Sequence, residues 1–264
     1  MEKDYLAINK NAWNNRTPVH VDSELYDMPA FTAGKSSLNS IEIELLGDIK
    51  GKKILHLQCH FGQDTLSLAR MGATVTGVDL SDVSIDKANE LSASLNIPAR
   101  FICCDIYSLP DHLDEEFDIV FTTYGTIGWL PDLEKWAGII DRYLKPGGQF
   151  IFAEFHPVVW MFDDNFDCVT YSYFNKQAIH ETINGTYTDN DADITTEIIS
   201  WNHSISDVIG NLLKKGLHIK DVKEYDYSPY NCFSGMEETE KGKFRIAKLA
   251  YKMPMVYALL AEKP

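Results

Sequence analysis

Hydrophobic and polar positions alternate in a regular way between Lys52 and Phe155. Short apolar runs, which are typical of buried strands, are separated by stretches whose apolar residues return at helical spacing. A parallel sheet covered by helices on both faces requires this alternation. The pattern therefore predicts an α/β fold with a doubly wound sheet, and it places strands at 53–58, 73–79, 99–105, 117–123 and 149–155.

Capping and turn residues predict where several elements begin and end. Ser81 suits the N-cap of the helix after the second strand, and Pro98 prevents that helix from continuing. The Lys-Pro-Gly-Gly segment 145–148 predicts a turn directly before the fifth strand. Ser204 and Gly216 bound a later amphipathic helix. Two further strands are predicted at 218–226 and 255–262.

Three segments depart from the alternation. Residues 1–50 carry scattered aromatic residues ahead of an apolar helix near Ile41, so we interpret them either as a lid or as an arm docked on the sheet. Residues 157–203 are rich in aromatic residues and contain the hairpin-type pair Asn184 and Gly185, which predicts an antiparallel insertion. The charged stretch 237–243 predicts a solvated connection. We therefore expect the arm 1–50 and one domain over 51–264 with the insertion 157–203.

Composition limits the partners and the compartment. The net charge of −15 disfavours phosphate backbones and anionic membrane surfaces, so neither nucleic acid nor membrane is an expected partner. The sequence shows no signal peptide and no long uncharged apolar run, which predicts a cytoplasmic protein. Its five cysteines form no metal-type pair, so no metal site is expected. Exposed edges of the insertion would allow a homodimer.

The turn after the first strand limits the choice of cofactor. A dinucleotide site needs three spaced glycines and a Walker A loop needs Gly-Lys-Ser/Thr, whereas residues 58–65 hold only Gly62. Asp79 ends the second predicted strand and Asp105 ends the third. Because ligands of open parallel sheets bind at the carboxyl ends of the strands, these acids are placed to hold a ribose and an adenine. A nucleoside cofactor without phosphates fits this pattern.

These features, with the Lys-Pro-Gly-Gly turn before the fifth strand, resemble those of the class I S-adenosylmethionine-dependent methyltransferases. The resemblance is clear over 52–155 and implies a Rossmann-like sheet of seven strands whose last strand, here 255–262, is antiparallel. The family turn usually reads acid then Gly-x-Gly-x-Gly. Here His56, Gln58 and His60 stand at the first three of those places, in a form that is similar to a bacterial small-molecule subgroup.

The resemblance implies S-adenosyl-L-methionine as the cofactor and assigns its contacts residue by residue. The methionine moiety would lie over the turn, the ribose on one acid, the adenine beside the other, and the methyl group near the end of the fourth strand. The implied cofactor-binding residues are Gln58, Cys59, His60, Gly62, Asp79, Leu80, Asp105, Ile106, Thr123 and Tyr124.

Methyl transfer from a sulfonium needs a well-placed acceptor and, for a hydroxyl or a protonated amine, a general base. Glu154 and His156 are the candidate catalytic residues, because strand alternation points both to one side at the end of the fifth strand. For His156, a backbone-bonding turn histidine is the other interpretation. The predicted function is therefore a methyltransferase acting on oxygen or nitrogen of a small-molecule acceptor. The alternatives are a non-catalytic S-adenosylmethionine-binding or regulatory protein and, disfavoured by the missing glycines, a nicotinamide-dependent oxidoreductase.

Overall fold

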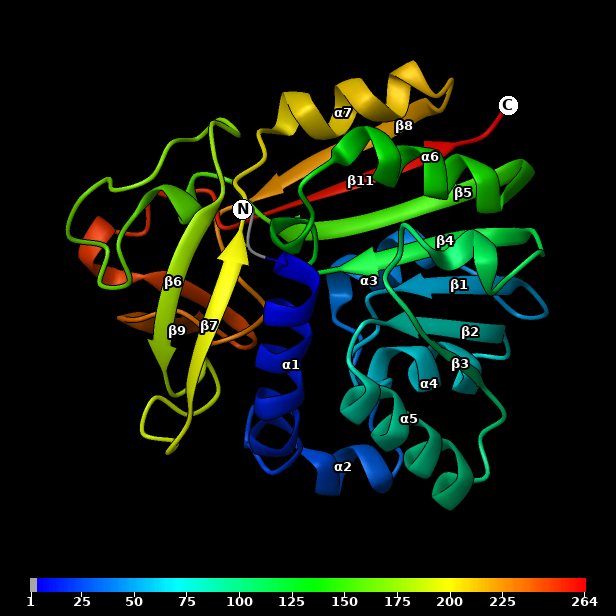
Figure 1. The fold of residues 1–264 in the computed structure, drawn as a ribbon, viewed down its shortest axis with the longest axis horizontal. Coiled ribbons are helices and arrows are strands. Elements are labelled where there is room, and N and C mark those ends of the chain that lie inside the picture. The colour runs from blue at the N-terminus through cyan, green and yellow to red at the C-terminus, as the bar shows by residue number, and fades with distance from the viewer. Residues whose placement is uncertain (1–3) are drawn as a thin grey trace.

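The computed structural model describes residues 4–264, and its main sheet has seven strands in the order β3-β2-β1-β4-β5-β11-β8 (Figure 1). The five strands from β3 to β5 in this order run parallel to one another, and β11 runs antiparallel to both β5 and β8. This arrangement confirms the predicted doubly wound, mostly parallel sheet. The strands are β1 Lys53–Leu57, β2 Thr74–Asp79, β3 Arg100–Cys103, β4 Phe117–Thr123, β5 Leu144–Phe155, β8 His218–Tyr225 and β11 Val256–Glu262.

Helices cover both faces of this sheet because successive strand residues point to opposite sides. Leu55 and the other buried strand residues on its face of the sheet pack under α6 Leu133–Tyr143 and α7 Ile205–Lys214. Ile54 and the buried strand residues on the opposite face pack under α3 Ser40–Leu46 and α4 Gln63–Arg70. Helix α5 Asp82–Leu95 lies beside α4. Short 3₁₀ segments complete the loops at Leu109–Asp111, Ile127–Trp129, Val159–Met161 and Ala247–Leu249.

The predicted capping residues have their expected positions. Ser81 accepts the Ser84 backbone N–H at 3.0 Å, and Ser204 forms a capping box with Asp207. The predicted Lys-Pro-Gly-Gly turn, however, lies inside β5. Phe117 pairs with Leu144 and Ile119 with Gln149, so β4 advances two residues (117 to 119) where β5 advances five (144 to 149). The segment is therefore an irregularity within the strand, with Gly147 at φ 76°.

The insertion 157–203 contains the antiparallel hairpin β6 Ile179–Asn184 and β7 Thr195–Ser200. The expectation of an Asn-Gly turn is corrected in one respect: Asn184 ends β6, and Gly185 only begins a connection that runs over 185–194. The Gly185 N–H donates to the carbonyl of Ile194 at 2.8 Å, so the connection is closed at its base.

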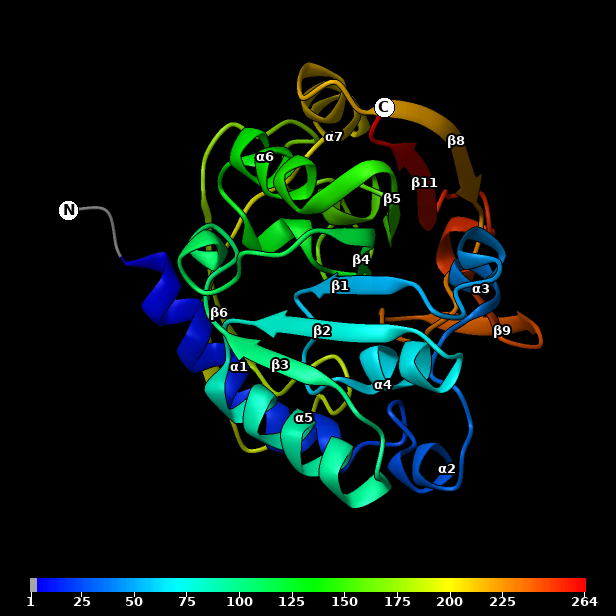
Figure 2. The same ribbon diagram turned by 90° about the vertical axis from the view of Figure 1, so that its right-hand side faces the viewer.

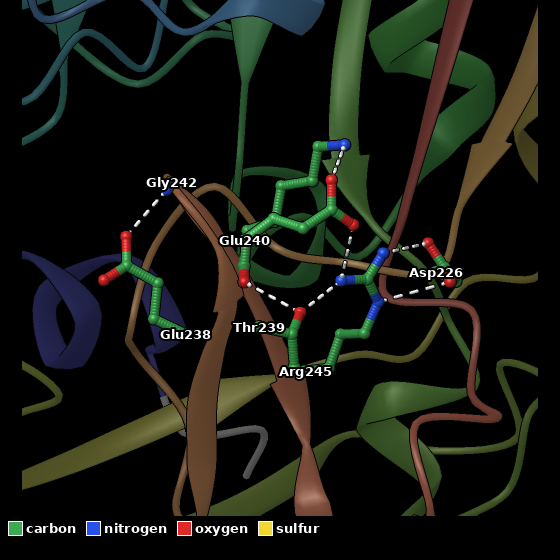
Figure 3. A network of polar contacts seen from close by, with 7 residues as sticks. Asp226, Glu238, Thr239, Glu240, Gly242 and Arg245 are labelled. Carbon is green, nitrogen blue, oxygen red and sulfur yellow. Dashed lines mark hydrogen bonds and ion pairs between the residues drawn. The ribbon is translucent and has the colours of Figure 1, made fainter.

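The charged stretch 237–243 is exposed along most of its length, as expected for a solvated connection, but it is not an irregular loop. It forms most of a second hairpin, β9 Met236–Glu240 and β10 Lys243–Ile246. Glu238 accepts the Gly242 N–H at the turn, and Arg245 contacts both oxygens of Asp226 at 3.0 and 3.2 Å (Figure 3). Lys243 and Arg245 of β10 pair with Glu240 of β9, so opposite charges face one another across the strands, which the simple charge count did not reveal.

The N-terminal arm forms α1 Tyr5–Val21, α2 Met28–Thr32 and α3. Helix α1 lies between the β6–β7 hairpin and α5 (Figure 1), and Figure 2 shows α1 alongside α5. The Asn9 side chain pairs with the backbone of Ile199, and Asn14 contacts Ser81 at the carboxyl end of β2. Within residues 4–264, no helix has the length and apolar character needed to cross a membrane.

Candidate functional site

The turn between β1 and α4 is fixed by Gly62, which has φ 82° and precedes the first residue of α4. A Cβ atom at this position would lie 2.8 Å from the Phe101 ring and 3.0 Å from Ala88. Only glycine fits this combination of left-handed backbone and close packing. The buried Cys59 donates its N–H to Val78 of β2, so the turn is anchored on the sheet.

Two residues of this turn adopt backbone conformations that favour glycine although neither is glycine. Gln58 has φ 56° and His60 has φ 50°. Each such residue costs about 1–2 kcal/mol and persists where its surroundings hold it. Gln58 Nε2 donates to the Thr126 carbonyl at 2.8 Å, and the His60 ring lies among aromatic side chains of the arm. The side chains therefore support a turn that the family pattern builds from glycine.

Asp79 links this turn to the start of α5. Its carboxylate accepts the His60 N–H at 2.8 Å and the Ser81 N–H at 2.9 Å, one on each oxygen. Burial raises the pKa of Asp79 to about 6, although these hydrogen bonds act in the opposite direction. Asp79 is in register with Cys103 of β3, and Asp105 follows two residues later. The two acids thus lie at the carboxyl ends of neighbouring strands, at the same edge of the sheet.

The remaining predicted cofactor residues lie at the same strand ends. Leu80 follows Asp79 and is half-buried, whereas the Ile106 side chain is part of the hydrophobic core, so only its backbone is available to a ligand. Asp105 accepts the Ser108 N–H, and burial raises its pKa. Thr123 ends β4 and donates to Asp64 at 3.5 Å.

A buried carboxyl that sequence reasoning missed lies beside the end of β4. Glu42 of α3 is 0% exposed and accepts the Tyr124 hydroxyl at 2.9 Å and the Asn39 N–H at 3.1 Å. Burial, followed by the nearby Asp64, raises the pKa of Glu42 to about 7. Tyr124 itself has φ 40°, a strained conformation for an aromatic residue. This pair can accept a proton close to neutral pH.

Strand alternation predicted that Glu154 and His156 point to one side, but in the structure the two side chains have partners on opposite sides of β5. Strand β5 ends at Phe155, so the alternation does not extend to His156. Glu154 accepts backbone N–H groups from residues 125, 126 and 127 after β4. His156 Nε2 instead contacts Glu224 of β8 at 2.8 Å, on the other side of β5. Both side chains therefore have partners that hold local structure.

Side chains of α1 cover the turn. The Trp13 ring lies 5.2 Å from the His60 ring and 5.3 Å from the Trp129 ring, and His20 Nδ1 lies 3.3 Å from His60 Nε2. Burial lowers the pKa of His20 to about 3 and that of His60 well below its usual range, so both imidazoles are neutral. Arg16, one turn before His20, is also buried beneath the insertion.

The central part of the chain matches a known family model. Residues 55–152 match the model described as a methyltransferase domain. The main sheet has the topology expected for that family, and the acids and the turn lie at the carboxyl ends of its strands. This part of the chain is similar to methyltransferase domains. It includes the turn, both acids and the end of β4.

Curated relatives show the same similarity, and solved structures share the fold. An uncharacterised methyltransferase of Synechocystis is 33% identical over 132 residues, which cover 49% of this chain and 59% of that protein. The ubiquinone biosynthesis O-methyltransferase of Pseudomonas fluorescens is 31% identical over 40% of this chain and 45% of that protein. The chain thus spans about half the length of the curated relatives it matches. A crystal structure of an S-adenosylmethionine-dependent methyltransferase from Clostridium acetobutylicum has a TM-score of 0.58 at 17% identity, covers 97% of this chain and 98% of its own, and shares the fold.

Proposed function

We propose that this protein transfers a methyl group from S-adenosyl-L-methionine to oxygen or nitrogen of a small molecule. The observation that carries the proposal is the position of Asp79, whose carboxylate joins the turn after β1 to the start of α5. Each of its oxygens accepts one backbone N–H and retains a lone pair for a ribose hydroxyl. Asp105, on the next strand, would hold the adenine edge.

The polar groups of the turn suit the amino-acid tail of this cofactor. Gln58 Oε1 and His60 Nδ1 are buried and have no hydrogen-bond partner within residues 4–264. Buried polar atoms without partners are costly, so a ligand that supplies partners is favoured at this site. The cofactor would bring the activated methyl group. The chain's own residues would hold it and exclude water from the transfer.

Tyr124 and Glu42 would receive the acceptor's proton. Tyr124 ends the segment that would flank the methyl group, and its hydroxyl already donates to Glu42. A carboxyl with a pKa near 7 suits a general base at neutral pH. The roles predicted for Glu154 and His156 stay predictions, and the hydrogen bonds of Glu154 to residues 125–127 favour a structural role for it.

The arm 1–50 is proposed to be a lid. Helix α1 contacts Ser81 and Ser84 on α5 and the His60 side chain on the turn, so it covers the strand ends next to Asp79. A ligand would enter when α1 moves away, and closure would then exclude water. The insertion 157–203 supplies the opposite wall through Ile199, which pairs with Asn9.

Calorimetry with S-adenosylhomocysteine tests the proposal. We expect saturable binding by the wild-type protein and about 10-fold or weaker binding by Asp79→Asn, because hydrogen bonds to a charged group contribute about 1.5–3 kcal/mol. Asp221→Asn, a change of a partly exposed acid on β8, should bind as the wild type does. Circular dichroism checks that both variants fold. Failure of the folded wild-type protein to bind at millimolar concentration would refute the proposal.

Binding without transfer is the second candidate function, and the replacement of two family glycines by Gln58 and His60 favours it. The two candidates differ in one result. A screen of metabolites with labelled cofactor would show methyl transfer for an enzyme and none for a binding protein. A nicotinamide-dependent oxidoreductase would instead show a thermal shift with a nicotinamide cofactor and none with S-adenosylhomocysteine.

A further inference from the structure

Within residues 4–264, Arg16 is a buried cation without an anionic partner. The residue is 4% exposed, its Nη2 contacts only the Thr196 hydroxyl at 3.4 Å, and its Nε has no hydrogen-bond partner within residues 4–264. No ion pair of Arg16 is present in that range, whereas Arg245 pairs with Asp226. A guanidinium does not lose its proton at ordinary pH, so its charge is buried at a cost of several kcal/mol.

The surroundings of Arg16 do not neutralise its charge. Its Cζ lies 5.6 Å from the centre of the Trp13 ring and 5.7 Å from that of Trp129. The charge of Glu181 acts on Arg16 from a distance, but within residues 4–264 no ion pair or hydrogen bond joins the two side chains. Ring faces attract a cation weakly compared with a carboxylate. The local structure therefore favours an additional anion.

Arg16 shares one side of α1 with two residues that contact the turn. Trp13 and His20 are three residues before it and four after it, a spacing that puts all three side chains on one helix face. Trp13 and His20 both contact the His60 ring. The guanidinium is thus held next to the turn that the cofactor tail would cross.

The two imidazoles add a donor to this site. His20 Nδ1 and His60 Nε2 share one hydrogen bond of 3.3 Å, so one ring donates and the other accepts. Each neutral ring carries one N–H. Whichever ring donates, the two outer nitrogens therefore comprise one N–H donor and one acceptor. Both outer nitrogens, His20 Nε2 and His60 Nδ1, are buried and have no partner within the described residues.

We propose that Arg16, with the His20–His60 pair beside it, is a receptor for a carboxylate. The carboxylate belongs either to the amino-acid tail of the cofactor or to the methyl acceptor. The inference rests on the proposed function, because that function supplies both sources. It predicts that the arm takes part in ligand binding directly, in addition to covering the site.

Two ligands, one with and one without the carboxylate, test whether Arg16 binds the amino-acid tail of the cofactor. S-adenosylhomocysteine carries the amino-acid tail, and 5′-methylthioadenosine lacks it. If the tail binds Arg16, Arg16→Met should weaken S-adenosylhomocysteine by about 30-fold or more and leave 5′-methylthioadenosine unchanged, as is typical when one partner of a buried charge pair is removed. Arg142→Met, which changes an exposed arginine of α6, is the matched control.

A thermal-shift measurement tests whether Arg16 binds a carboxylate of the methyl acceptor. With S-adenosylhomocysteine saturating, sodium benzoate is compared with sodium chloride at equal ionic strength. The site is assigned to the acceptor if benzoate stabilises the wild type but not Arg16→Met. In that case the two proteins should bind S-adenosylhomocysteine with the same affinity. The inference is overturned if Arg16→Met binds S-adenosylhomocysteine and responds to benzoate as the wild type does. Absence of nucleoside binding by the wild type would instead refute the proposed function.

Stability of the unliganded protein separates a receptor from a structural arginine. Because the buried charge lacks a partner, Arg16→Met should melt at the wild-type temperature or above it. A lower melting temperature with unchanged ligand affinities would show that Arg16 only holds α1 in place, and it would overturn the inference.

Discussion

Replacing Glu42 by Gln tests whether ionisation of the carboxyl beside Tyr124 lowers the free energy of unfolding. Gln has nearly the shape of Glu and can still accept the Asn39 N–H, so the change mainly removes the charge. Glu42 is 0% exposed, and the groups that face it are Asp64, Tyr124 and Asn39. None of these groups is a cation. Burial and the charge of Asp64 oppose ionisation of Glu42, and they outweigh the hydrogen bonds from Asn39 and Tyr124, which favour it.

The expected effect follows from the raised pKa, which moves from 4.5 to about 7 on folding. The folded protein binds this proton more tightly than the unfolded chain does, so the stabilising contribution is complete below pH 4.5. It is lost as the pH rises toward 7. Between pH 5 and pH 8 the wild type should lose about 2–3 kcal/mol of unfolding free energy from this group alone. Glu42→Gln should not show this loss.

Denaturant unfolding at pH 5 and pH 8 measures the difference. The unfolding free energy of Glu42→Gln relative to the wild type should rise by about 2–3 kcal/mol between the two values. Glu44→Gln is the matched control, since Glu44 lies on the same helix but is exposed and pairs with Lys223. If the two variants change equally between pH 5 and pH 8, Glu42 is not a buried acid of raised pKa, and its proposed role as a base fails.

Two further predictions concern packing and a buried imidazole. Gly62→Ala should lower the unfolding free energy by about 2–5 kcal/mol, because it combines a left-handed backbone with a contact on Phe101; chemical denaturation should show no such loss for Gly210→Ala, where a Cβ meets nothing within 4 Å. Burial lowers the pKa of His156 and Glu224 opposes this effect, so Glu224→Gln should lower that pKa further, which an NMR titration would detect. An unchanged His156 pKa would contradict the 2.8 Å contact between the two side chains.

The sheet and the edge that carries the site could be predicted because their signals are local. Each strand is a continuous apolar run, and Ser81 and Ser204 cap helices through neighbours three residues away. Asp79 ends β2 and Asp105 lies two residues beyond the end of β3, so parallel pairing was sufficient to bring them to one edge. Prediction was less accurate at the hairpin 236–246, because its charge pairs form only when the chain folds back.

Glu42 and Arg16 could not be found by the same reasoning. Each lies on a helix of the arm, far in sequence from the strands it approaches, and its chemistry arises from burial that no local pattern encodes. The stripe of Trp13, Arg16 and His20 at helical spacing was the only available signal, and it has many ordinary explanations. Pairing of His156 with Glu224 likewise depends on β11 lying between β5 and β8.

The strained turn connects the arm to the cofactor site energetically. A left-handed backbone at Gln58 and at His60 costs about 1–2 kcal/mol each, which glycine would avoid. Gln58 offsets this cost through Thr126, within the methyltransferase domain, whereas the His60 ring contacts Trp13 and His20 on α1. Displacement of α1 therefore removes the contacts that hold His60. Opening of the arm should loosen the same backbone whose N–H bonds Asp79, so entry of a ligand and order of the turn are coupled.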